Sequence, residues 1–469
     1  MDLTRNRMAR AVGKARDVIV ANAARGLDQV KTPLYRNAFY LMLAYAVGVA
    51  GGLLFWVVAY RFYSSNDTGF AIAMLNTLTF LAGVATLGMP IALIRFLPES
   101  DNPTALTNSV LTVSGGIVFV LSLVFIIGLP VWAPGLVVQF WRPEYVPIIV
   151  LTGIAYTFGP VLDQAAIAVR RADLYFWRIV IFSVTKIPLP VVFALLLGQA
   201  LIRIRVLGIY MSWSIAFGVS VLVAAFIFLP RVIPGYRPRP GYSRERLRPM
   251  FGFSIGNWVA GVIGSGGSLL LPLLIINTLR PIGTGAAVIT SSDSTAVYYA
   301  ATVVAGSLSA IPAATMTSFY AEASQRNAAR RRDERRAIGL SLALLIPGIL
   351  ALWFLADTLL RILFDLRPEL ADLGTPALQI LGLASIPVFL NTIFGTRVRI
   401  RKQVAPSIVS AGILTATTLI LGYLFLTWYG LPGLAWAVVL GNAAATPYLF
   451  FAAGKPIEEE AIEPAPIVP

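Results

Sequence analysis

Long apolar runs joined by short polar segments make up most of this 469-residue chain. Each run is about long enough to cross a hydrocarbon core of roughly 30 Å as a helix. Six runs lie near residues 35–60, 69–94, 105–129, 146–169, 175–198 and 206–229, and six near 251–278, 294–319, 338–356, 376–396, 405–427 and 433–453. The pattern therefore predicts an all-α membrane protein with about 12 transmembrane helices.

A basic segment separates the two sets of runs. Residues 231–249 (RVIPGYRPRPGYSRERLRP) carry six arginines and repeated prolines, which no helix inside a bilayer tolerates. We predict a cytoplasmic hinge at 231–249 between an N-lobe at 34–230 and a C-lobe at 250–453, with six spans each.

The two ends differ from the rest of the chain. Residues 1–33 are basic, and their apolar residues recur at helical spacing, which favours an amphipathic helix on the inner membrane surface. A disordered basic arm is the alternative. Residues 454–469 contain three consecutive glutamates and several prolines, and we expect a disordered cytoplasmic tail.

Composition supports a membrane protein and excludes several kinds of chemistry. The chain is 57% hydrophobic and 13% charged, whereas soluble proteins carry roughly 25% charged residues. It has no cysteine and no histidine, so thiolate chemistry and the commonest general base are absent. We find no P-loop for ATP hydrolysis, and we expect neither a metal nor another cofactor.

Membrane topology explains the net charge of +15 better than nucleic acid binding does. If the spans alternate in direction, 29 Lys and Arg residues lie on the side of the termini and the hinge, and 7 lie on the other side. This count places Arg178 among the residues of the loop before the fifth span. The bias predicts that both termini are cytoplasmic.

Similar motifs recur at corresponding positions of the two halves. Asp67 opens the second span and Asp293 opens the eighth, as helix N-caps would, and each span contains an Ala-Gly pair followed by a proline. Because six spans return the chain to the same side, the halves share one orientation. A pseudo-twofold axis along the membrane normal would then relate them.

Six stretches carry a family resemblance. They are 37–63 (NAFYLMLAYAVGVAGGLLFWVVAYRFY), 67–69 (DTG), 86–99 (TLGMPIALIRFLPE), 170–174 (RRADL), 297–300 (VYYA) and 429–436 (YGLPGLAW). Together, and in this order, they resemble the polysaccharide and O-antigen flippases of the multidrug/oligosaccharidyl-lipid/polysaccharide exporter superfamily. The basic N-terminal segment and the loop at 281–285 (PIGTG) depart from the pattern of that family.

The resemblance implies two six-helix lobes arranged as a V around a central cavity that opens alternately to either side. It implies a transporter, not an enzyme, that flips polyprenyl-pyrophosphate-linked oligosaccharide across a prokaryotic cytoplasmic membrane for surface polysaccharide such as the O-antigen of lipopolysaccharide. It further implies a proton or Na⁺ gradient as the driving force. We expect a monomer that meets membrane lipids, the lipid-linked glycan, and the polymerase and transferases of the same pathway.

Ionisable residues within spans are the first candidates for moving a pyrophosphate through oil, because a bare anion there is very costly. Lys186 lies roughly 18 Å from the inner surface along the fifth span. We interpret it as a cation that meets the pyrophosphate; the alternatives are a structural pair with Asp163 and snorkelling to the interface. Asp163 could instead be an ion-coupling site. Pro188 and Pro190 should kink this helix.

Residues near the inner ends of other spans are further candidates. Arg36, Arg95 and Arg397 could gather the anionic headgroup, and the alternative for each is an interfacial anchor. Asn37 and Asn257 could hydrogen-bond sugar hydroxyls, although such side chains more often join helices inside membranes.

Two other functions stay open at this stage. A cation-coupled multidrug extruder of the same superfamily would need acids in its cavity, and only Asp163 lies clearly within a span. A membrane glycan polymerase or ligase would need acids or bases on a substantial outer loop, and the largest, near 357–376, is modest. We therefore favour the flippase.

Overall fold

The computed structural model describes residues 33–197, 205–283, 288–323, 330–401 and 403–454, and most of them are helical. The predicted basic segment at 1–33 and the predicted tail at 454–469 lie outside these residues, except for one residue of each. Ile282 and Ile289 form an isolated antiparallel bridge, and the described part of the chain has no sheet. The predicted all-α class is confirmed.

The helices of the first half match the first six predicted spans. They are α2 (Pro33–Phe62), α3 (Ser65–Ala85) with the short α4 (Met89–Phe96), α5 (Pro103–Ile127), α8 (Val146–Ala168), α9 (Ala172–Lys186) with α10 (Leu189–Leu197), and α11 (Arg205–Val223). Two short helices, α6 (Leu129–Trp132) and α7 (Pro134–Phe140), connect α5 to α8.

The helices of the second half are longer. They are α12 (Arg244–Leu269) with α13 (Leu271–Thr278), α14 (Ser291–Ala323), α15 (Arg330–Phe364), α16 (Pro368–Ile400) and α17 (Ala405–Ala453). Proline follows within two residues of the break in both α9–α10 and α12–α13, and the second pair bends by 40°. Helix α9 ends at Lys186 and α10 begins at Leu189, so the helix is interrupted where Pro188 and Pro190 predict a kink.

Ten of the described helices are long and apolar enough to cross a membrane, and the bent pair α12–α13 makes eleven. Helix α17 has 49 residues, or roughly 74 Å of helix, which is more than twice a hydrocarbon core of roughly 30 Å. Its backbone leaves the helical region at Gly430, where φ is 66° and ψ is −146°. Since glycine adopts positive φ without strain, α17 forms two arms, and the described helices supply the twelve predicted spans.

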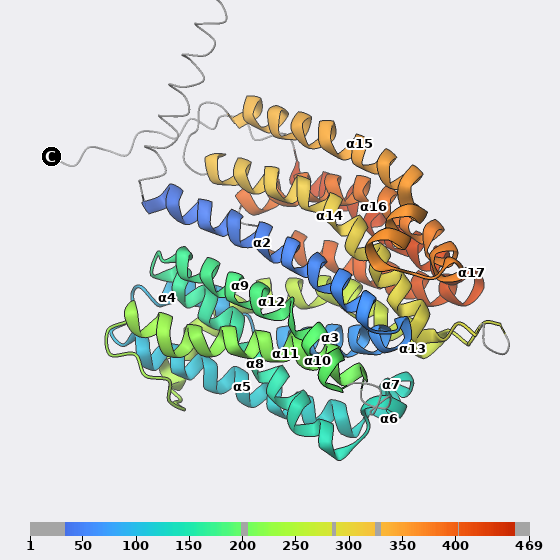
Figure 1. The fold of residues 1–469 in the computed structure, drawn as a ribbon. Coiled ribbons are helices and arrows are strands. Elements are labelled where there is room, and N and C mark those ends of the chain that lie inside the picture. Colours follow the sequence, from blue (N-terminus) through green and yellow to red (C-terminus); the bar gives the residue numbers. More distant parts are fainter. Residues whose placement is uncertain (1–32, 198–204, 284–287, 324–329, 402, 455–469) are drawn as a thin grey trace, which may run out of the picture.

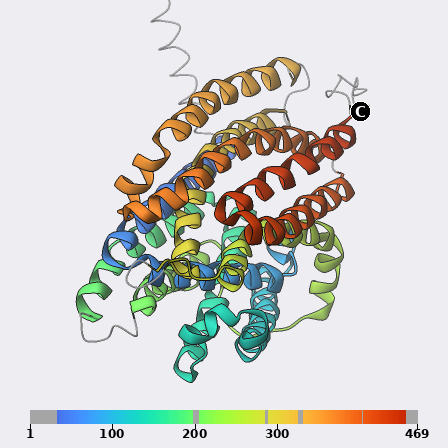
Figure 2. The ribbon, with the colours of Figure 1, turned by 90° about the vertical axis from the view of Figure 1, so that its right-hand side faces the viewer.

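The helices of the two halves form two groups. Helices α5, α8 and α11, coloured cyan to light green, lie on one side, and α15–α17, coloured orange to red, lie on the other (Figure 1). The same separation is seen after a quarter turn (Figure 2). Helices α3 and α14 pack together where the groups meet, and one core cluster joins residues of both halves, including Trp56 and Tyr298.

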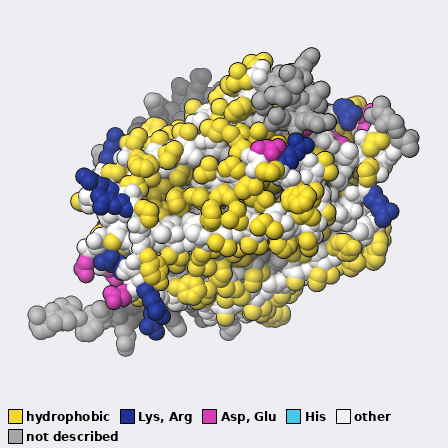
Figure 3. Space-filling model, turned by 90° about the horizontal axis from the view of Figure 1, so that it is seen from below, with side chains coloured by type: hydrophobic (Ala, Val, Ile, Leu, Met, Phe, Trp, Pro, Cys, Tyr) yellow, Lys and Arg dark blue, Asp and Glu magenta, His cyan; other side chains and the backbone are white. Residues whose placement is uncertain are grey.

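The outer surface suits contact with lipid. The face seen in Figure 3 is covered by hydrophobic side chains, and most of its Lys and Arg side chains lie towards its two ends. Large apolar residues such as Val120, Leu222 and Phe354 are more than half exposed. In a soluble protein such patches would promote association, whereas in a bilayer they meet acyl chains.

The segment between the lobes is shorter than predicted, because α12 already begins at Arg244. It is also fixed to the N-lobe by α5. Asn108 donates from Nδ2 to the carbonyl of Arg237 at 2.8 Å, and the amide of Gly241 donates to Thr112 Oγ1 at 2.9 Å. We call the end of the bundle that carries residues 231–243 the hinge end, and the opposite end the far end.

At the far end, α3 and α14 begin with similar N-caps. The amide of Asp67 donates to Ser64 Oγ at 3.1 Å, and the amide of Asp293 donates to Thr290 Oγ1 at the same distance. Each aspartate in turn accepts a hydrogen bond from the residue that it faces, Ser64 or Thr290. The N-cap positions predicted at Asp67 and Asp293 are therefore wrong by three residues, because these carboxylates reach back to Ser64 and Thr290, which cap.

These two helix starts also bind each other across the lobes. Asn66 donates from Nδ2 to Thr290 Oγ1 at 2.7 Å and to Ser292 Oγ at 2.6 Å, and Ser65 donates to Asp293. Tyr60 of α2 adds a hydrogen bond of 2.6 Å to the carbonyl of Ala296. The lobes are therefore joined at the far end by side chains of both.

Candidate functional site

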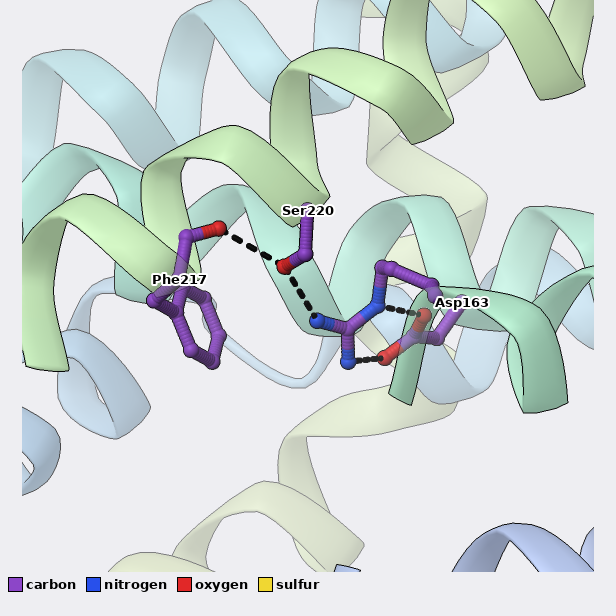
Figure 4. Close-up of polar contacts among 4 residues, drawn as sticks. Asp163, Phe217 and Ser220 are labelled. Atoms are coloured by element: carbon purple, nitrogen blue, oxygen red, sulfur yellow. Dashed lines mark hydrogen bonds and ion pairs between the residues drawn. The ribbon is translucent and has the colours of Figure 1, made fainter. Parts of the chain in front are cut away.

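A buried ion pair lies inside the N-lobe. Asp163 of α8 accepts hydrogen bonds from Nε and Nη2 of Arg178 on α9, and both side chains are less than a tenth exposed. Arg178 also donates from Nη1 to Ser220 Oγ at 3.2 Å, and Ser220 donates to the carbonyl of Phe217 at 2.7 Å (Figure 4). The pair is bidentate, which is the strongest geometry available to arginine and a carboxylate.

The loop position predicted for Arg178 is wrong, because α9 begins at Ala172 and carries Arg178 into the bundle. The partner of Asp163 is thus Arg178, and the alternative pairing with Lys186 is not formed. Burial of the guanidinium is tolerated because the carboxylate and the serine hydroxyl use its donors.

Arg178, Phe182 and Lys186 are four residues apart, so they share one face of α9. That face is turned towards α11. The guanidinium of Arg178 lies 5.3 Å from the ring of Phe217, and the rings of Phe182 and Phe217 lie 5.0 Å apart. The three side chains therefore form a continuous column of cations and aromatic rings inside the N-lobe.

Lys186 lies at the end of this column, where aromatic rings enclose its ammonium group. It is 1% exposed, and its Nζ lies 4.2 Å from the ring centre of Phe182 and 4.4 Å from that of Trp213. Within the described ranges it makes no ion pair or hydrogen bond. Aromatic faces stabilise its cationic form, but no carboxylate neutralises it.

Two tryptophans connect this enclosure to the boundary between the lobes. Trp213 stacks on Trp56 of α2 with ring centres 5.7 Å apart, and Trp56 contacts Tyr299 of α14 edge-on at 5.1 Å. Lys186 therefore lies directly behind an aromatic wall that the N-lobe presents to the C-lobe.

A pocket of about 340 Å³ lies at the boundary of the lobes, beyond this wall. Asn76 of α3 lines it from the N-lobe, and the remaining walls come from α12–α14, α16 and both arms of α17. Its polar lining consists of Asn76, Ser268, Tyr298, Tyr299, Thr302, Thr418 and Asn442. Since none of the lining residues is Lys, Arg, Asp or Glu, the pocket offers hydrogen bonds without a fixed charge.

A second hollow of about 480 Å³ lies at the far end, beside the contacts that join the lobes. Asp293, Asp365 and Arg367 line it together with Tyr60 and Tyr63. Asp293 already accepts hydrogen bonds from Ser65 and Thr290, so it acts there as part of the inter-lobe contact.

The other predicted residues lie at the hinge end. Arg36 is exposed, and Asn37 Oδ1 accepts a hydrogen bond of 3.2 Å from the amide of Ala172, which ties α2 to the start of α9. Arg95 is exposed and lies 4.9 Å from the ring centre of Phe253.

Arg397 and Asn257 have contrasting surroundings. Arg397 donates from Nε to Glu334 at 2.7 Å, and this pair between α15 and α16 is largely buried. Asn257 is exposed on α12. The structure thus groups Asp163 and Lys186 in one lobe interior and places Arg36, Arg95, Asn257 and Arg397 outside that group.

Several residues of the site were not predicted. Phe182 and Trp213, which enclose Lys186, read in the sequence as ordinary apolar residues of their spans. The four-residue spacing of Arg178, Phe182 and Lys186 is the signal that could have revealed the column. Nothing in the sequence marked Asn76, Thr418 or Asn442, because three different spans bring them together.

With this geometry established, the fold can be compared with known structures. An inward-facing multidrug resistance MATE family transporter of the MOP superfamily has a TM-score of 0.62 at 14% identity, over 86% of this chain and 93% of that one. The lipid II flippase MurJ in an inward closed conformation has a TM-score of 0.62 at 13% identity, over 90% of this chain and 88% of that one.

A third similar structure is a MOP superfamily transporter from Pyrococcus furiosus, whose binding pocket is described as having reverse polarity that suggests a different function. Its TM-score is 0.54 at 14% identity, over 90% of this chain and 94% of that one. No protein-family model matches the sequence, and no curated protein matches it either.

The chain therefore has the fold of MOP superfamily transporters and is a multi-pass membrane protein. The likeness at these identities concerns the fold alone. Since a multidrug transporter and a lipid flippase share it, the cargo has to be argued from the chemistry of the interior.

Proposed function

We propose that this protein flips a polyprenyl-pyrophosphate-linked oligosaccharide from the inner to the outer leaflet of a prokaryotic cytoplasmic membrane, for surface polysaccharide synthesis. One observation carries the proposal. The N-lobe interior holds a lysine that no acid of the described chain neutralises, while the acid of the same interior is already bound by Arg178.

The balance of charge in this interior favours an anionic cargo. The Asp163–Arg178 pair is close to neutral as a unit, so a protonated Lys186 adds one positive charge behind Trp56 and Trp213. Charges act over longer distances in a medium of low dielectric constant than in water. A pyrophosphate passing between the lobes would be stabilised by this field, and its lipid tail would stay in the bilayer.

The lobes supply the movement in this proposal. Residues 34–230 and 250–453 would rock about the basic segment that joins them, so that the passage opens first at the hinge end. The exposed Arg36 and Arg95 would gather the headgroup there, and a proton or Na⁺ gradient would drive the cycle. Asp163 would act as the coupling site only in a state in which Arg178 releases its carboxylate. The Lys and Arg distribution favours the hinge end as cytoplasmic.

The likeness to a multidrug transporter favours a second candidate, the extrusion of cationic drugs. Such a cargo would need a carboxylate. Asp163 is buried, and both of its oxygens accept hydrogen bonds from Arg178, so a drug cation would have to displace a bidentate partner. Lys186 would also repel it.

Proteoliposomes that contain the purified protein test the proposal. A fluorescent polyprenyl-pyrophosphoryl glycan is placed in one leaflet, and its appearance in the other is followed by a membrane-impermeant quencher. Flipping above the rate of protein-free vesicles supports the proposal. Transport of ethidium in the same vesicles, without flipping of the glycolipid, would overturn it in favour of the drug extruder.

A further inference from the structure

Thr418 in the pocket between the lobes carries a buried hydroxyl without a partner. It is 1% exposed, and its Oγ1 makes no hydrogen bond within the described chain. An unpaired buried hydroxyl is destabilising and calls for an explanation, such as a ligand that supplies its hydrogen-bond partner. Space is made for it by Gly441 on the other arm of α17, where a Cβ atom would collide with Oγ1.

Other polar groups of the pocket each use one donor on their own helix. Asn76 and Asn442 donate from Nδ2 to the carbonyls of Ile72 and Val438, each at 2.9 Å. Thr302 donates to the carbonyl of Tyr298 at 2.9 Å. Because an asparagine amide has a second N–H, and amide and hydroxyl oxygens keep acceptor lone pairs, these groups offer the pocket both donors and acceptors.

A neutral lining of hydrogen-bond donors and acceptors selects the chemistry of its ligand. A phosphate needs a cation to offset its charge and a cation needs a carboxylate, and this lining has neither. A ligand with many hydroxyl groups and an apolar face satisfies these donors and acceptors as well as the rings of Tyr298 and Tyr299. A sugar ring has this combination.

We propose that this pocket binds the sugar nearest the pyrophosphate of the lipid-linked cargo, with Thr418, Asn76 and Asn442 as its hydrogen-bonding residues. This inference rests on the proposed flippase function and assigns the anion and the glycan of the cargo to different sites. The field of Lys186 acts on the anion from the N-lobe, and the pocket holds the neutral glycan. Its volume, about 340 Å³, is near the lower limit of roughly 300–1,000 Å³ for ligand pockets, which suits one sugar ring or two.

A pair of matched substitutions on one arm of α17 tests the pocket. Thr418→Val removes the unpaired hydroxyl with little change of shape. Thr427→Val is the control, because Thr427 is exposed and its Oγ1 donates to the carbonyl of Leu424 on its own helix. Asn76→Leu is a second pocket variant on the opposite lobe.

The probes are a polyprenyl-pyrophosphate that carries N-acetylglucosamine and the same lipid without sugar. Wild type should flip the glycosylated lipid at least about tenfold faster at low concentration, since sites that pair with hydroxyl groups discriminate strongly against analogues that lack them. Thr418→Val and Asn76→Leu should abolish this preference and leave the rate of the bare lipid unchanged. Thr427→Val should behave as wild type.

Calorimetric titration of the purified protein with neutral mono- and disaccharides separates failure of the pocket from failure of the function. Saturable binding that Thr418→Val removes supports the pocket even if no flipping is seen. Flipping of both lipids at equal rates in wild type and variants would overturn the pocket while the flippase stands. Thr418-dependent binding of ethidium or Na⁺ in place of sugar would also overturn it.

Discussion

Arg178 holds Asp163 through two parallel hydrogen bonds inside the N-lobe, where neither side chain is more than a tenth exposed. Charges buried in this way are retained only if each has its partner, because the desolvation of a single ion is not offset by anything else. The two residues are therefore one unit, and its neutrality leaves Lys186 as the charge that distinguishes this interior.

Removing one member of this unit should destabilise the protein more than removing both. Arg178→Met leaves a buried carboxylate and should lower the free energy of unfolding by about 3–5 kcal/mol, and Asp163→Leu should have a similar effect. The double variant should be closer to wild type than either single one. Thermal unfolding in detergent, followed by tryptophan fluorescence, compares the unfolding midpoints of wild type, the two single variants and the double variant. A double variant as unstable as the sum of the singles would refute the coupling.

Loss of the charge on Lys186 should slow flipping without unfolding the protein. Lys186→Met keeps the length of the side chain within the enclosure of Phe182 and Trp213, and we expect at least about a tenfold lower rate for the glycolipid, equivalent to about 1.4 kcal/mol. Lys186→Arg should retain part of the rate. Arg280→Gln, which removes a positive charge from an exposed loop, is the matched control. If Lys186→Met flipped the glycolipid at the wild-type rate, Lys186 could not be the cation that stabilises the pyrophosphate.

The apolar runs and the arginine-rich segment were sufficient to predict the helices, because bilayer thickness fixes the length of a span regardless of its neighbours. They also identified Lys186 and Asp163. The partner of Asp163 could not be found in this way, since Arg178 sits only six residues after the start of α9 and a charge so near a span end reads as a loop residue. The pocket could not be predicted from the sequence either, because Asn76 and Asn442 meet only through the packing of α3, α14 and α17.

A covalent link across the far end should stop transport, because alternating access requires that contact to open. The chain has no cysteine, so a cross-linker can react only with the engineered cysteine pair. Asn66→Cys with Ser292→Cys replaces two side chains that now touch at 2.6 Å across the lobes, and a short dithiol-reactive cross-linker should block flipping until the link is cleaved.

The control for this link is Thr315→Cys with Ser341→Cys, whose hydroxyl oxygens lie 2.5 Å apart within the C-lobe. Its cross-linking should leave the rate unchanged, because it joins helices that move together. Full activity of the linked Asn66–Ser292 pair would show that the far end does not open during the cycle.

Gly69 permits the close approach of α3 to α14, and a single methyl group there should prevent the far end from closing. A Cβ atom at Gly69 would collide with the carbonyl oxygen of Ser292, and a carbonyl in the first turn of a helix cannot yield without disturbing α14. In Gly69→Ala, a cysteine at position 66 should become several-fold more reactive to a membrane-impermeant maleimide, and flipping should slow. Gly83→Ala, on the same helix but with open space around its Cβ, should change neither property. Equal maleimide rates in both variants would mean that α3 and α14 do not form the seal.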